Sequence, residues 1–192
     1  MSRTAKITRK TNETDVMVYF SLDGSGTADV ATGIGFFDHI LTSFATHGRF
    51  DLTVKASGDL EVDEHHTIED VGIVLGSAIA KSFGNKKGIA RFGEARIPMD
   101  EAIASVAIDV SGRSFLVYSS AFKTSFVGSM NTQMVKHFFE SLVSHAEITL
   151  HIEAKGNNDH HICEVLFKAF GVALRRSCVI EGDNVPSTKG VL

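Results

Sequence analysis

Residues 65–69 read His-His-Thr-Ile-Glu, and residues 160–164 repeat the pattern as His-His-Ile-Cys-Glu. Each copy opens an apolar segment with helical spacing, so we expect both copies at helix starts. On a helix, side chains four residues apart share a face, so His65 and Glu69 can bind one metal ion. His66 points about 100° away from His65. Because the second copy has the same spacing, the two helix starts predict two metal ions shared between two such helices.

A polar helix start is the simpler explanation for a single copy of this pattern. Glu69 falls in the first turn, where a carboxylate is favourable near the positive end of the helix dipole. Two copies in one chain are much harder to explain in that way, so we favour metal binding.

The sequence around the two copies also repeats. His39 and His47 stand eight residues apart, as do His137 and His145. A strand-like segment follows each pair, ending in Ala-Ser-Gly at 56–58 and Ala-Lys-Gly at 154–156, and then comes the His-His motif. Such a repeat predicts two similar halves related by a pseudo-twofold axis. We place them at residues 1–87 and 88–192, as repeats within a single catalytic unit.

The periodicity of each half predicts an α+β fold. Alternating or β-branched runs predict strands, and apolar residues at helical spacing predict helices. The expected strands are 5–11, 16–22, 28–32, 50–56, 89–97, 104–110, 115–122 and 148–154. The expected helices are 36–46, 65–83, 131–142 and one that starts at the second His-His motif. Each half would then be strands followed by β-α-β-α, a mixed sheet with helices packed on one face and against the other half's helices.

The composition is that of a globular protein. The chain has 192 residues, of which 43% are hydrophobic, and a formal net charge of −4. The charge gives no basic surface of the kind that binds nucleic acid, and no apolar run reaches membrane-spanning length. Two cysteines are too few for a disulfide framework, and the N-terminus lacks the apolar segment of a signal peptide. We therefore expect a soluble, cytoplasmic protein with neither a nucleic-acid nor a membrane partner.

The repeat selects eight candidate metal ligands. They are His39, His65, His66 and Glu69 in the first half and, in matching order, His137, His160, His161 and Glu164 in the second. Since the middle histidines point away from their neighbours, we expect the halves to exchange them. One ion would be bound by His39, His65, Glu69 and His161, and the other by His137, His160, Glu164 and His66. Three imidazoles and one carboxylate suit Mn²⁺, Fe²⁺, Co²⁺ or Zn²⁺ and leave open positions on the ion.

His47 and His145 also match each other. Each is expected near the end of a helix, where a positive charge is favourable. We therefore favour a structural or supporting role for them over metal ligation.

The chain resembles a known family, the imidazoleglycerol-phosphate dehydratases of histidine biosynthesis. The resemblance extends over nearly the whole chain, in segments 9–14, 37–41, 63–70, 98–102, 159–164 and 186–190. The two His-His motifs and the Pro-Ser-Thr-Lys-Gly tail at 186–190 are its most specific parts. The chain departs from the family pattern at Ser114 and Phe115, where proline and tyrosine are more usual.

The resemblance implies a hydro-lyase that converts imidazole glycerol phosphate to imidazole acetol phosphate. It implies a duplicated fold and a homo-oligomer of 24 subunits built from trimers. It also implies two Mn²⁺ ions per active site, with the eight ligands above drawn from neighbouring subunits.

The resemblance further assigns groups that contact the substrate. They are Glu13, His39, His47, His65, Glu69, Arg91, Arg113, His160, Lys168, Ser187, Thr188 and Lys189. Glu13, Glu69 and Glu164 are assigned to catalysis, with Glu13 as the candidate for proton transfer. Without the family, Glu13 would be interpreted as a surface carboxylate at a strand end. Arginine and lysine side chains are expected to hold the phosphate: Arg91, Arg113, Lys168 and Lys189.

Two other functions fit the metal ligands alone. One is a dinuclear metallohydrolase that uses the ions to activate water. The other is a metal-binding or storage protein without enzymatic activity. The set of arginines and lysines favours the lyase over the hydrolase, which need not place such residues around a phosphate group. A storage protein would need neither Glu13 nor the tail at 187–192.

Overall fold

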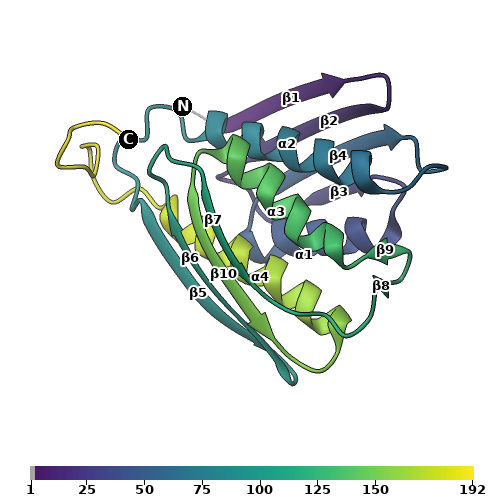
Figure 1. The fold of residues 1–192 in the computed structure, drawn as a ribbon. Helices are drawn as coiled ribbons and strands as arrows, with labels where there is room; N and C mark the ends of the chain where they lie inside the picture. The colour runs from purple at the N-terminus through teal and green to yellow at the C-terminus, as the bar shows by residue number, and fades with distance from the viewer. Residues whose placement is uncertain (1–2) are drawn as a thin grey trace.

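The computed structural model describes residues 3–192, in which two four-stranded sheets enclose a layer of four helices (Figure 1). The first half contributes β1 (Thr4–Lys10), β2 (Thr14–Ser21), β3 (Ala28–Ala31), α1 (Gly35–Gly48), β4 (Asp51–Gly58) and α2 (His65–Ser82). Its sheet has the order β1-β2-β4-β3, in which β3 runs parallel to β4 and the other pairs are antiparallel.

The second half repeats this arrangement. It contributes β5 (Phe92–Met99), β6 (Ala102–Asp109), β7 (Phe115–Ser119), α3 (Gln133–Ala146), β10 (Thr149–Lys155) and α4 (Asp159–Ser177). Its sheet order is β5-β6-β10-β7, again with one parallel pair at the edge. Identical strand orders and directions show the duplicated, mixed-sheet α+β fold that the sequence predicts.

The second half also carries an insertion that the sequence did not predict. β8 (Phe126–Val127) and β9 (Met130–Asn131) form a small antiparallel hairpin before α3. The expected strand 115–122 ends at Ser119, and the chain then turns toward the start of α4. There the carboxylate of Asp159 accepts hydrogen bonds from the backbone N–H groups of Lys123 (2.9 Å) and Thr124 (2.7 Å).

Close helix packing joins the two halves. α2 packs on α3 and α1 packs on α4, so each pair takes one helix from each half. Two glycines at matching positions, Gly76 in α2 and Gly171 in α4, allow the helices to approach. A β-carbon on Gly171 would lie 2.5 Å from the backbone oxygen of Phe44, and one on Gly76 would clash with that of Leu142.

Aromatic side chains fill the space where the helices meet. Phe44 stacks on Phe170 with ring centroids 5.2 Å apart, and Phe138 stacks on Phe167 at 5.3 Å. All four side chains are buried, and they belong to one cluster of buried apolar residues from both halves. None of the helices within residues 3–192 is both long enough and apolar enough to cross a membrane.

Candidate metal centre and basic pocket

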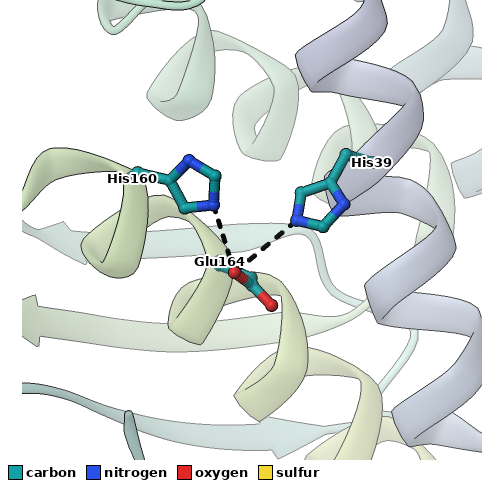
Figure 2. Close-up of side chains that lie close together, drawn as sticks. All are labelled: His39, His160 and Glu164. Atoms are coloured by element: carbon teal, nitrogen blue, oxygen red, sulfur yellow. Dashed lines mark ion pairs between the residues drawn. The ribbon is translucent and has the colours of Figure 1, made fainter. Parts of the chain in front are cut away.

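One group of candidate ligands joins α1 to the start of α4. We call His39, His160 and Glu164 the α4 cluster. Nε2 of His39 lies 3.5 Å from Oε2 of Glu164, and Nε2 of His160 lies 3.3 Å from the same oxygen. Figure 2 shows the two imidazole rings on either side of the carboxylate. The i,i+4 spacing on α4 therefore brings His160 and Glu164 together as the sequence predicts.

A second group joins α3 to the start of α2. We call His65, Glu69 and His137 the α2 cluster. Oε2 of Glu69 lies 3.8 Å from Nε2 of His65 and 3.7 Å from Nε2 of His137, and the two rings are 4.4 Å apart. Nε2 of His137 is buried and has no hydrogen-bond partner among the described residues. A ring nitrogen without a partner in that position is available to bind a metal ion.

The donor atoms of both clusters fit a divalent metal ion. Metal–nitrogen and metal–oxygen bonds of about 2.1 Å place neighbouring donor atoms roughly 3.0–3.4 Å apart. The observed nitrogen–oxygen separations of 3.3–3.8 Å are close to this range and too long for good hydrogen bonds. Two imidazoles and one carboxylate suit Mn²⁺, Fe²⁺, Co²⁺ or Zn²⁺ and leave room for further ligands.

The structure corrects the predicted division of ligands between the ions. His39 was expected beside His65 and Glu69, but within one chain it lies with His160 and Glu164. His137 was expected beside His160 and Glu164, but it lies with His65 and Glu69. The physical reason is the helix packing, since α1 lies against α4 and α3 against α2. Each cluster therefore does contain one candidate ligand from the other half, but it is the histidine of α1 (His39) or α3 (His137) and not the middle histidine of a His-His motif.

The middle histidines of the two motifs lie apart from both clusters within one chain. Nδ1 of His66 is 3.0 Å from Oδ2 of Asp59, and Nδ1 of His161 is 2.9 Å from Oε2 of Glu101. Each carboxylate raises the pKa of its histidine. A carboxylate on Nδ1 also orients an imidazole so that Nε2 can bind a metal ion. Within one chain neither predicted four-ligand set is complete.

Glu13 and Glu101 occupy matching hairpin turns, before β2 and before β6. Glu13 Oε2 lies 3.8 Å from Nδ1 of His66, and Glu13 is 54% exposed. Glu101 binds His161 and accepts hydrogen bonds from the backbone N–H groups of Asn157 and Asn158. These contacts, His161 first, lower the pKa of Glu101 to about 2. Sequence reasoning gave Glu101 no role, although its turn corresponds to the turn of Glu13.

Lys168 lies beside the α4 cluster. Its Nζ donates a hydrogen bond of 2.7 Å to Oε1 of Glu164, one helical turn away, and contacts Sδ of Met99 at 3.4 Å. Burial raises the pKa of Glu164, but the hydrogen bond and charge of Lys168 together with His39 outweigh it, so the net shift of the pKa is downward. Burial lowers the pKa of His47, and the charge of Lys168 lowers it further. His145 instead points Nδ1 toward the backbone oxygen of Ser141, 2.9 Å away.

A basic pocket of about 470 Å³ forms between the β6–β7 turn and the C-terminal tail. It brings together most of the predicted phosphate-binding residues; its lining includes Arg91, Ser111, Arg113, Ser187, Thr188 and Lys189. Arg91 is fixed by Asp109 (Nε to Oδ1, 2.7 Å) and donates to the backbone oxygen of Pro186 (2.9 Å). Arg113 forms an ion pair with Asp109 (Nη2 to Oδ2, 3.5 Å) and is 66% exposed, so much of its guanidinium group remains accessible to an anion. Lys168 is not part of this lining.

The basic pocket and the metal clusters lie at opposite ends of the helices. The backbone N–H of Arg91 donates to the oxygen of Ser177, the last residue of α4, whereas His160 stands in the first turn. With a rise of 1.5 Å per residue, these ends are about 25 Å apart. In Figure 1 the C-terminal tail lies at one end of the helical layer, and the β8–β9 hairpin lies at the other, near the start of α2.

Comparison with known proteins assigns the chain to a family. The sequence profile of imidazoleglycerol-phosphate dehydratase matches residues 32–174. An imidazoleglycerol-phosphate dehydratase of Methanosarcina mazei is 62% identical over 190 residues, which cover 99% of this chain and 100% of the relative. One from Caldicellulosiruptor saccharolyticus is 50% identical over 192 residues, covering 100% of this chain and 99% of the relative.

Solved structures agree with the sequence comparisons. The imidazoleglycerol-phosphate dehydratase of Staphylococcus aureus superposes with a TM-score of 0.83 at 35% identity, covering 92% of this chain and 99% of that one. The Pyrococcus furiosus enzyme, in complex with (S)-C348, also gives 0.83, at 34% identity, covering 97% and 100%. With its duplicated fold, its paired His-Glu clusters and these matches along its length, the chain belongs to the imidazoleglycerol-phosphate dehydratase family.

Proposed function

We propose that this chain dehydrates imidazole glycerol phosphate to imidazole acetol phosphate with divalent metal ions held by the α2 and α4 clusters. The observation that carries the proposal is the pair of matching His-Glu clusters in a chain of this family. The proposal includes the phosphate-binding role of the basic pocket and the identity of the metal as Mn²⁺, with two ions per active site. Family membership favours this lyase over the metallohydrolase and the storage protein.

The reaction removes water across two neighbouring carbons of the substrate. The hydroxyl group next to the imidazole ring leaves with the C–O bond electrons, and a proton leaves the adjacent carbon. The resulting enol becomes the ketone of the product. A bound divalent ion would supply Lewis-acid polarisation of the imidazole ring, which the reaction needs because the departing hydrogen is not acidic.

The chain's own residues would bind the ions and orient the ring. Glu69 and Glu164 supply the carboxylates, and the histidines of each cluster supply imidazole nitrogens, as do His66 and His161. Asp59 and Glu101 hold Nδ1 of these last two histidines, leaving Nε2 available as a ligand atom.

Glu13 is the proposed proton-transfer group. Its side chain is half-exposed on a hairpin turn next to His66, so it can reach a substrate bound there. A carboxylate in this place can take a proton from one atom of the substrate and return it to another. His47 and Lys168 are proposed to contact the substrate from the side of Glu164.

The basic pocket is proposed to bind the phosphate group. Arg113 offers a planar fork of donors and Lys189 a point charge, and Ser187 and Thr188 add hydroxyl groups. Asp109 holds Arg91 in place through two hydrogen bonds, so little side-chain entropy is lost on binding.

A separation of about 25 Å is too long for one small substrate to bridge within a chain. We therefore propose that the active site is shared between subunits, so that the clusters of one chain meet the pocket of another. This is consistent with the trimer-based assembly of 24 subunits that the resemblance implies. A cytoplasmic location is part of the same proposal.

A turnover assay with controlled metal tests the proposed function. Purified protein is stripped with a chelator, supplied with Mn²⁺, and assayed for ketone formation from imidazole glycerol phosphate. We expect no turnover after stripping and full turnover after Mn²⁺ is restored. Undiminished turnover by fully stripped protein would exclude a role for the clusters in the reaction.

A further inference from the structure

A buried lysine lies beside the basic pocket. Lys86 is 8% exposed, and its one ion-pair partner among residues 3–192 is Glu147, whose Oε2 lies 3.8 Å from Nζ and whose side chain is 60% exposed. That distance is too long for a hydrogen bond. Most of the Lys86 side chain is enclosed, and an ammonium group with little access to solvent and no close hydrogen-bonding partner is unfavourable. The position of Lys86 therefore requires an explanation.

The ammonium group of Lys86 lies behind one wall of the pocket. Its Nζ is 3.6 Å from the place that a β-carbon on Gly112 would take. Gly112 stands between Ser111 and Arg113, and both of these line the pocket. The carbonyl carbon of Leu192, another lining residue, is 3.0 Å from the same point. The Nζ of Lys86 thus lies close to the turn that presents Arg113.

The backbone at Lys86 makes a lysine costly. Its φ of 56° is left-handed, and so are the φ angles of the glycines two residues to either side, Gly84 (59°) and Gly88 (71°). A glycine would adopt this conformation without strain. The presence of lysine at position 86, where glycine would be less strained, indicates that the lysine side chain has a role.

We propose that Lys86 is a positioning residue of the basic pocket, holding the Ser111–Arg113 turn and adding positive charge behind it so that phosphate binds more tightly. This inference rests on the proposed function of the pocket. Because Lys86 is buried, its charge is screened less by salt than a surface charge would be. It lies far from the metal clusters, so its removal weakens substrate binding and leaves the chemical step unchanged.

A purely structural role makes a different prediction. The backbone N–H of Lys86 donates to the oxygen of Phe83 at the end of α2, and Glu147 follows α3 directly. A positive charge is favourable near such helix C-termini. In that role, loss of the charge would lower stability without changing the affinity for phosphate.

The test compares Lys86→Gln with Lys87→Gln, a matched control at the exposed neighbouring lysine. KM and kcat are measured with imidazole glycerol phosphate, inhibition with inorganic phosphate, and stability by thermal unfolding. We expect Lys86→Gln to raise both KM and the inhibition constant roughly tenfold at constant kcat. Lys87→Gln should match the unaltered protein, and Lys86→Arg should restore most of the affinity.

A second variant gives an effect of opposite sign and keeps the test decisive if Lys86→Gln does not fold. Glu147→Gln removes the exposed counter-charge, so KM and the inhibition constant should fall. If KM and the inhibition constant were unchanged in both Lys86→Gln and Glu147→Gln, while Arg113→Ala raised KM, the role of Lys86 would be overturned but the pocket would remain the phosphate site. If Arg113→Ala also left KM unchanged, the pocket itself would not be the phosphate site.

Discussion

At the residue scale, the two carboxylates of the candidate metal clusters have different surroundings. One oxygen of Glu164 accepts a hydrogen bond from Lys168 and the other faces two histidines, and its side chain is 11% exposed. Glu69 has Ile73 where Glu164 has Lys168, and it is 40% exposed. The pseudo-twofold axis therefore relates candidate ligands of the same type in unequal electrostatic environments, and we expect the two clusters to bind metal with different affinities.

Removing a histidine of either cluster should abolish turnover. His65→Ala and His160→Ala each delete a proposed ligand, so the loss of metal affinity should exceed the roughly 10–100-fold that follows loss of a ligand's hydrogen-bond partner. Metal content and turnover at low Mn²⁺ check this. His151→Ala, at an exposed histidine on β10, is the control and should be active. Normal turnover in either cluster variant would contradict the ligand assignment.

Glu13 and Glu101 occupy corresponding turns, but we expect different roles: proton transfer for Glu13 and orientation of His161 for Glu101. Glu13→Gln keeps size and hydrogen bonding but cannot transfer a proton, so kcat should fall by about 10²–10⁴ with metal content unchanged. Glu101→Gln loses the charge that holds His161, so it should bind metal more weakly. Metal analysis alongside steady-state kinetics distinguishes them, and an unchanged kcat in Glu13→Gln would remove Glu13 from the mechanism.

At the element scale, local periodicity was sufficient for most of the fold and for part of the site. The i,i+4 spacing correctly joined His160 to Glu164, because a helix fixes that geometry without tertiary information. The partner of His39 depends on which helices pack together, and this is set by close contacts such as that at Gly171. The same limit applies to the β8–β9 hairpin, whose strands of two residues carry no periodic signal.

Gly171→Ala should destabilise the fold, because its β-carbon would meet the backbone of α1, which cannot easily move. Strain of this kind typically costs about 1–3 kcal/mol. Chemical denaturation measures the free energy of unfolding. Gly182→Ala is the matched control, since nothing lies near the place of its β-carbon. Equal stability of the two variants would show that the α1–α4 contact is looser than described.

At the scale of the whole molecule, the two parts of the proposed site lie far apart within one chain. The basic pocket adjoins the end of α4, and the metal clusters adjoin the starts of α2 and α4. His66 and His161 belong to neither cluster, and the carboxylates of Asp59 and Glu101 hold their Nδ1 atoms. The Nε2 atom of each is therefore left to bind a metal ion. Both observations are explained if neighbouring chains complete each other's sites.

Chelation should then reduce the size of the assembly. Metal that binds only the assembled state stabilises it, so removal should favour a smaller species such as a trimer, and Mn²⁺ should restore the large particle together with activity. Size-exclusion chromatography with light scattering measures this. If the stripped protein keeps its size and its thermal stability, the ions do not bridge subunits.

The most direct test of a shared active site is complementation between two inactive variants. His160→Ala damages the α4 cluster but leaves the basic pocket intact, whereas Arg113→Ala combined with Lys189→Ala damages only the pocket. The two proteins are dissociated, mixed, reassembled with Mn²⁺ and assayed for ketone formation. If sites are shared between chains, the mixture should regain activity that neither parent shows, because some sites combine an intact cluster with an intact pocket. A mixture that assembles but stays as inactive as its parents would place both parts of the site in one chain and contradict the account.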